Sequence, residues 1–257
     1  MGDISIELGD DHVAVVEIHR PPSNFFDADL ICAISDAYEQ LDEDPACRAI
    51  VLCSEGKHFC AGANFGAPAE PPAQTGVSAP RDLYAEAARI IEAKTPVVAA
   101  VHGAAIGGGL GLACSADFRV GCSETRMAAN FAHLGFHHGF GLTITLPPIV
   151  GQQRALELLL TGKRIDGETA SRIGLLDRFV AVGEVRAEAR RLAAEIASAA
   201  PLAIASIRAT MRAGIGERYR QATAHEGREQ ARLRATEDFR EGIRASAERR
   251  PPVFQGK

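Results

Sequence analysis

Two short stretches of small residues, Phe59-Cys60-Ala61-Gly62-Ala63-Asn64 and Gly107-Gly108-Gly109-Leu110-Gly111, decide how this chain folds. Each follows an apolar run rich in β-branched residues, which predicts that both stretches are turns leaving buried strands. Glycine and alanine let the backbone approach a ligand closely, and the second stretch opens a predicted helix at its positive end. One backbone N–H from each turn is therefore predicted to point at a single oxygen, as in an oxyanion hole.

Composition and charge narrow the class of protein. The 257 residues are enough to bury a large core without disulfides or metals, and no apolar run approaches the ~20 residues of a membrane span. The acidic segment Met1–Asp10 has no signal-peptide core, so a cytoplasmic protein is expected. The six cysteines form no Cys-x-x-Cys pair, which predicts reduced, buried thiols. A net charge of −5 without a dense basic block predicts neither nucleic acid nor membrane as a partner.

Hydrophobic periodicity predicts an α/β body over residues 1–198. Residues 4–8 and 13–18 alternate as a β-hairpin, and a helix is expected from Asp27 to about residue 44. The same patterns predict further strands at 49–53, 96–101, 118–121, 126–128 and 177–182, and helices at 81–93, 107–116 and 151–160. The proline-rich stretch 66–80 is predicted to be a loop that lines a variable pocket.

Residues 199–257 are predicted to form an all-helical tail. From residue 184 onward the pattern is almost purely helical, with helices at 184–198, 202–213 and 218–247 and a break near Gly242. A long helical tail beside a compact body commonly docks on a neighbouring subunit. We therefore expect a homo-oligomer.

The ordered motifs of the chain resemble the crotonase superfamily, the enoyl-CoA hydratase/isomerase family. The resemblance covers almost the whole chain, which makes it far more specific than one glycine-rich turn. It is carried by Ile18-His19-Arg20-Pro21, Asn24, Ala61-Gly62-Ala63-Asn64, Pro96 to Gly103, Gly107-Gly108-Gly109, Leu160 to Ile165, Ala170 to Leu175, Glu241-Gly242 and Arg250 to Lys257.

The resemblance implies a spiral of ββα units whose helical tail closes a homotrimer or a dimer of trimers. It implies an acyl-CoA thioester as the ligand, with coenzyme A as part of the substrate and no separate cofactor. It also implies that the N–H groups of Ala61 and Gly108 hold the thioester oxygen, each stabilising a developing charge by roughly 3 kcal/mol. By the same resemblance, substrate contacts are expected from Arg20, Lys57, Gly62, Ala63, Asn64 and Lys257, with the cations on phosphates and an acyl chain against Phe131, Phe136 and Phe140.

The chain departs from the family pattern where relatives carry their catalytic carboxylates. By the family spacing, the two hydratase glutamates correspond to Gly111 and Phe131, and the carboxylate of some isomerases, dehalogenases and hydrolases corresponds to Gly139. Asn64 stands where many relatives carry aspartate. Adding water across a double bond ordinarily needs an acid and a base, so ordinary hydration is not expected.

Histidines are the remaining candidates for acid–base chemistry. His137 and His138 lie in the segment that carries this machinery in relatives, and an imidazole titrates near neutral pH. The alternative is that both are packing or surface residues on a loop. His133 and His137 have the spacing of zinc ligands on a helix, but Gly135 between them and the absence of an adjacent glutamate predict no metal site.

Three functions remain open from the sequence. The first is an acyl-CoA enzyme that performs isomerisation, decarboxylation, hydrolysis or carbon–carbon cleavage through an enolate or a tetrahedral oxyanion. The second is a non-catalytic acyl-CoA-binding protein. The third is a hydratase whose acid and base come from elsewhere, for example from His137 and a water.

Overall fold

A computed structural model describes residues 2–64 and 82–257. The predicted loop at 66–80 lies outside these residues. The strands are β1 (Ile4–Leu8), β2 (Val13–Ile18), β3 (Ala49–Ser54), β4 (Val97–Val101), β5 (Ala104–Ile106), β6 (Phe118–Cys122), β7 (Arg126–Ala128), β8 (Ile165–Asp166) and β9 (Arg178–Val180). The helices are α1 (Ala28–Asp42), α2 (Leu83–Glu92), α3 (Gly108–Ser115), η1 (Asn130–Leu134), α4 (Leu142–Val150), α5 (Gln152–Thr161), α6 (Gly167–Arg172), α7 (Val185–Ala197), α8 (Pro201–Met211), α9 (Ile215–Arg234) and α10 (Glu237–Ala247).

The body of the molecule is built on two sheets. The larger has the order β1-β2-β3-β4-β6-β9, with β1 antiparallel to β2 and the remaining neighbours parallel. The smaller sheet has the order β5-β7-β8. Strand β3 is buried along its whole length, as expected for a parallel strand covered on both faces. The predicted α/β spiral with a helical C-terminal region is confirmed.

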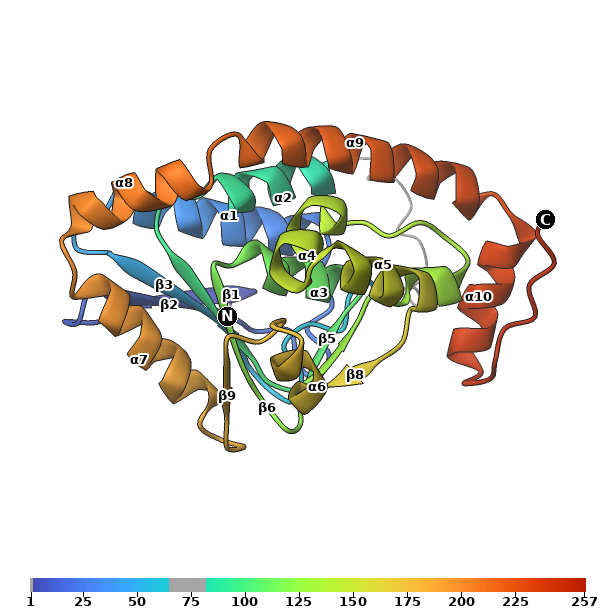
Figure 1. The fold of residues 1–257 in the computed structure, drawn as a ribbon, viewed down its shortest axis with the longest axis horizontal. Helices are drawn as coiled ribbons and strands as arrows, with labels where there is room; N and C mark the ends of the chain where they lie inside the picture. Colours follow the sequence, from blue (N-terminus) through green and yellow to red (C-terminus); the bar gives the residue numbers. More distant parts are fainter. Residues whose placement is uncertain (1, 65–81) are drawn as a thin grey trace.

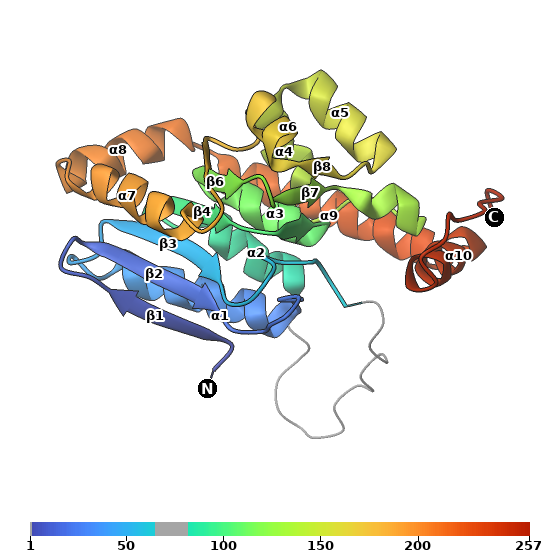
Figure 2. The same cartoon turned by 90° about the horizontal axis from the view of Figure 1, so that it is seen from below.

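Helices cover both faces of the larger sheet (Figure 2). Helices α1 and α2 lie on one face, and α7 packs on the other, where Val185, Ala189 and Ala193 meet Val51 and Val98. Among the described residues, no single helix is long and apolar enough to cross a membrane, although α7 and α8 pass that test together while meeting at 105°.

The helical tail divides into parts with different surroundings (Figure 1). Helix α9 runs beside α2, and Phe239 of α10 packs against Phe136, with 5.3 Å between the ring centroids. Helix α8 buries none of its residues and exposes Leu202, Ile207 and Met211. The part of the tail that follows residue 215 therefore closes over its own chain.

The predicted break near Gly242 is wrong. The chain leaves the helix at Ala235, and Thr236 then caps α10 by accepting a hydrogen bond from the Phe239 N–H at 3.1 Å. Gly242 lies inside α10, where a Cβ atom would come within 2.5 Å of the Leu134 carbonyl carbon. This glycine therefore allows close packing of α10 on η1.

Candidate functional site

The two glycine-rich turns lie side by side. The Cys60 N–H donates to the Ala104 carbonyl at 2.9 Å, and the Ile106 N–H donates to the Cys60 carbonyl at 3.0 Å. A Cβ atom on Gly109 would lie 2.1 Å from the Cys60 carbonyl oxygen. Only glycine permits this approach, so the two turns are in direct contact through their main chains.

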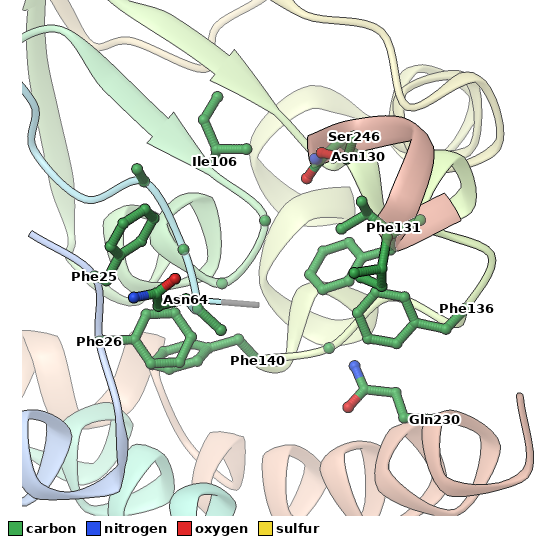
Figure 3. Close-up of a pocket in the computed structure, with 18 of the residues that line it drawn as sticks. Phe25, Phe26, Asn64, Ile106, Asn130, Phe131, Phe136, Phe140, Gln230 and Ser246 are labelled. Atoms are coloured by element: carbon green, nitrogen blue, oxygen red, sulfur yellow. The ribbon is translucent and has the colours of Figure 1, made fainter. Parts of the chain in front are cut away.

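Both turns open on a cavity of about 320 Å³. Its walls are largely apolar, with Phe25, Phe26 and Phe140 on one side and Phe131 and Phe136 on the other (Figure 3). The rings interlock: the centroids of Phe26 and Phe140 are 5.3 Å apart, and those of Phe131 and Phe136 are 5.5 Å apart. A small apolar cavity with few polar groups is typical of a binding site for a small ligand.

One of the two predicted backbone donors needs correction. The Ala61 N–H donates to the Ser23 carbonyl at 2.9 Å, so it is already engaged inside the protein. Ala63 also lines the cavity, and its N–H makes no hydrogen bond to any described residue. The sequence could not show this difference, because Ser23 approaches the turn from a distant segment.

The second predicted donor, Gly108, has the expected position. It is the first residue of α3 and lines the cavity, and a first-turn N–H has no partner within its own helix. The Gly108 N–H also donates to no acceptor elsewhere in the described parts of the chain. The N–H groups of Ala63 and Gly108, contributed by adjacent turns, thus have no hydrogen-bond partner among the described residues.

The other predicted ligand contacts divide into two groups. Gly62, Asn64, Phe131, Phe136 and Phe140 line the cavity, as expected. Arg20, Lys57 and Lys257 do not. The guanidinium of Arg20 is held by the carboxylates of Asp3 and Asp27, at 2.5 and 2.7 Å. Lys57 and Lys257 are exposed and remain predicted phosphate contacts.

His137 and His138 lie outside the cavity lining, contrary to their predicted role. Nδ1 of His137 bonds the His138 carbonyl at 2.8 Å, and Nε2 of His138 bonds Oγ1 of Thr143 at 2.8 Å. The two rings stack on each other with centroids 4.1 Å apart. Burial and the neighbouring His137 and His225 lower the pKa of His138 to about 4. His138 is therefore neutral near pH 7. It packs between His137 and Thr143, outside the cavity lining.

Glu226 is a buried carboxylate that contacts the same segment of the chain. Its oxygens accept hydrogen bonds from the N–H groups of Gly141 at 2.9 Å and Thr143 at 3.1 Å, at the start of α4. Oγ1 of Thr143 donates to the same carboxylate at 2.5 Å. Burial nevertheless raises the pKa of Glu226. Its position at a helix N-terminus fixes the segment that ends in Phe140.

Two positions assigned to missing carboxylates have no room for a side chain. A Cβ atom on Gly111 would lie 2.6 Å from Cβ of Phe140. A Cβ atom on Gly139 would lie 2.3 Å from the Tyr84 hydroxyl and 2.4 Å from Nε2 of Gln230. The ring of Phe140 and the Tyr84–Gln230 pair therefore occupy the space next to these glycines.

Five polar cavity residues in the described part of the chain were missed by the sequence analysis: Tyr84, Asn130, Gln230, Arg234 and Ser246. The Tyr84 hydroxyl donates to Oε1 of Gln230 at 2.9 Å, and Nε2 of Gln230 donates to the His137 carbonyl at 3.1 Å. Burial raises the pKa of Tyr84 to about 12. A signal for this group exists in the sequence, because Glu226, Gln230 and Arg234 recur every four residues and so share one face of α9.

Comparison with known proteins agrees with this architecture. The family model described as "Enoyl-CoA hydratase/isomerase" matches residues 9–257. The chain is 33% identical to a probable enoyl-CoA hydratase of Bacillus subtilis over the full length of both proteins. It is 34% identical to the carnitinyl-CoA dehydratase of Salmonella typhi, with 94% of each chain covered.

Solved structures agree as well. An enoyl-CoA hydratase/isomerase from Pseudoalteromonas atlantica superposes with a TM-score of 0.87 at 28% identity, covering 99% of this chain and 100% of its own. A carnitinyl-CoA hydratase from Mycobacterium avium gives a TM-score of 0.86 at 29% identity, covering 99% of both chains. The protein therefore belongs to the enoyl-CoA hydratase/isomerase family of acyl-CoA-processing enzymes.

Proposed function

We propose that this protein binds an acyl-CoA thioester with the carbonyl oxygen between the N–H groups of Ala63 and Gly108. The observation that carries the proposal is the pair of unpartnered backbone donors from adjacent turns, both lining one apolar cavity. Negative charge that develops on the oxygen as an enolate or a tetrahedral intermediate forms is stabilised by roughly 3 kcal/mol per donor. Coenzyme A enters as part of the substrate, without a separate cofactor.

The reaction that we propose differs from two-carboxylate hydration. Among the described residues that line the cavity there is no aspartate, glutamate or histidine. Steric crowding at Gly111 and Gly139 supports the same conclusion. Isomerisation, decarboxylation, hydrolysis and carbon–carbon cleavage all use the oxyanion site. Decarboxylation suits it especially, because loss of carbon dioxide generates the enolate without a protein base.

The same composition of the cavity favours a second candidate, a protein that binds acyl-CoA without turning it over. Incubation with a panel of CoA thioesters, followed by mass spectrometry, separates the two functions. Conversion of one thioester supports the enzyme, whereas micromolar binding without any product supports the binding protein. Rapid hydration of crotonyl-CoA would contradict the proposed reaction class, and failure to bind every thioester would contradict both candidates.

The oxyanion site itself is tested by Gly108→Val, because a Cβ atom at Gly108 would lie 2.3 Å from the Phe26 ring. We expect this variant to lose thioester binding or turnover. The matched control is Gly2→Ala at the exposed N-terminus, where the nearest atom to the new methyl group is 3.6 Å away. Equal activity of the two variants would contradict the assignment of Gly108.

We further propose that the protein forms a homotrimer or a dimer of trimers through α8. Leu202, Ile207 and Met211 are 86%, 60% and 80% exposed, and large apolar side chains at such density are typical of subunit interfaces. Light scattering after size exclusion gives the mass in solution. Leu202→Glu together with Met211→Glu is expected to lower that mass, and a monomeric wild-type protein would contradict the proposal.

A further inference from the structure

Arg234 differs from its neighbours on the inward face of α9. Glu226 is satisfied by α4, and Gln230 is satisfied by Tyr84 and the His137 carbonyl. The guanidinium of Arg234 has neither an ion pair nor a hydrogen bond with any residue in the described ranges. It is therefore a cation at the cavity without a counterion among residues 2–64 and 82–257.

Three other arginines in the tail are neutralised by nearby carboxylates. Arg232 pairs with Glu229 at 2.7 Å, Arg244 pairs with Glu241 at 2.5 Å, and Arg220 pairs with Glu92. Arg234 stands out because it lines the cavity and its Cζ atom lies 5.6 Å from the centroid of the Phe136 ring. Stacking on an aromatic ring holds a guanidinium in place while leaving its N–H groups free for an anion.

Arg234 lies on a different wall of the cavity from the two glycine-rich turns. Phe136, on which it stacks, belongs to the wall that faces Phe25 and Phe26 across the cavity (Figure 3). Among the described lining residues, Arg234 is the only one with a formal charge. A ligand whose thioester oxygen sits at Ala63 and Gly108 thus meets a single positive charge at the other wall.

We propose that Arg234 binds a carboxylate at the far end of the acyl group, so that the preferred substrates are short acyl-CoA thioesters with a second, free carboxylate. The inference rests on the proposed thioester site. A guanidinium binds a carboxylate through two parallel hydrogen bonds. Arg234 is exposed to solvent, so the expected preference comes from this paired geometry and not from exclusion of water. The cavity volume of about 320 Å³ suits a short acyl group. A cationic acyl group would be repelled.

Binding measurements with three matched acyl groups test this inference. Glutaryl-CoA carries the second carboxylate, pentanoyl-CoA has the same number of carbons without it, and 4-(trimethylammonio)butanoyl-CoA carries a cation. We expect calorimetry to show glutaryl-CoA binding about 10- to 100-fold more tightly than pentanoyl-CoA, with the cationic thioester binding most weakly. Arg234→Gln should remove this preference while leaving the affinity for pentanoyl-CoA unchanged.

The control variant is Arg228→Gln, which removes an exposed arginine from the same helix outside the cavity. It should retain the preference for glutaryl-CoA. Acyl-pantetheine thioesters, which lack the nucleotide and its phosphates, identify the anion that Arg234 meets. The preference should persist with them.

An Arg234→Gln effect that is equal for glutaryl-CoA and pentanoyl-CoA, and that disappears with pantetheine, would assign Arg234 to a coenzyme A phosphate and overturn the inference. Equal affinities of the wild-type protein for glutaryl-CoA and pentanoyl-CoA would overturn it as well, while leaving the proposed thioester site intact. Failure of all thioesters to bind would reject the proposed function itself.

Discussion

The two walls of the cavity use different parts of the polypeptide. One wall presents backbone N–H groups at Ala63 and Gly108, on turns held together by direct contacts between main chains. Helix α9 contributes two polar side chains, Gln230 and Arg234, to the rest of the lining. In the proposed function, these backbone donors hold the thioester oxygen. The exposed side chain of Arg234 has no hydrogen bond or ion pair to hold the described fold together, so it is suited to select the acyl group.

The largest effect is expected from separating the two turns. Gly109→Ala places a methyl carbon 2.1 Å from the Cys60 carbonyl oxygen, which is backbone and cannot rotate away. Moving the turns apart misplaces at least one donor, so turnover of the thioester processed fastest in the panel should fall by about 100-fold or more. Steady-state kinetics on the folded variant measures the change.

Gly227→Ala is the matched control for this substitution. Its new methyl group would lie 3.4 Å from the Tyr84 ring, an ordinary contact, and glycine in a helix interior is less favourable than alanine. This variant should retain turnover. Unchanged turnover in Gly109→Ala would show that the spacing of the turns does not control the oxyanion site.

Substitution of the buried Glu226 on α9 is expected to lower the stability of the protein. Glu226→Ala removes the acceptor for the N–H groups of Gly141 and Thr143, which start the helix behind Phe140. Leaving such groups without a partner should lower the free energy of unfolding by about 3 kcal/mol, as measured by urea denaturation. Glu229→Ala, which removes a partly exposed carboxylate paired with Arg232 on the same helix, should leave the free energy of unfolding close to the wild-type value. Similar losses in both variants would contradict a special role for Glu226.

A smaller effect concerns pH. The pKa of His138 is lowered from 6.5 to about 4 in the folded protein, so the unfolded chain binds a proton between these values while the folded chain does not. This histidine therefore makes stability fall as the pH drops from 6.5 to 4, by on the order of 2 kcal/mol. Urea denaturation of His138→Gln should show a flatter pH dependence over that window. Parallel curves for the variant and the wild type would contradict the assignment.

The comparison of the two walls also explains what the sequence could predict. The turns were predictable because glycine and alanine follow buried strands within a few residues, so the signal is local. Choosing Ala63 in place of Ala61 required knowledge of Ser23, a residue from a distant segment whose carbonyl accepts the Ala61 N–H in the folded protein. The spacing of four residues between Gln230 and Arg234 was enough to predict that they share one face of α9. The sequence could not predict that this face lines the cavity, because the packing of the tail depends on contacts between segments far apart in the chain.

The smallest effect on catalysis is expected from substituting His137. This substitution tests whether a residue in the segment that carries the catalytic groups of relatives also acts at the site of this protein. His137 and His138 occupy the segment where relatives carry their acid–base groups, yet their rings bond the His138 carbonyl and Thr143 and do not line the cavity. A side chain that does not reach the reacting atoms contributes no proton transfer. His137→Ala should therefore change kcat/KM by less than about threefold at pH 7, in contrast to Gly109→Ala. A loss of 100-fold or more with an unchanged melting temperature would bring His137 back as a catalytic residue and would require the loop to rearrange when substrate binds.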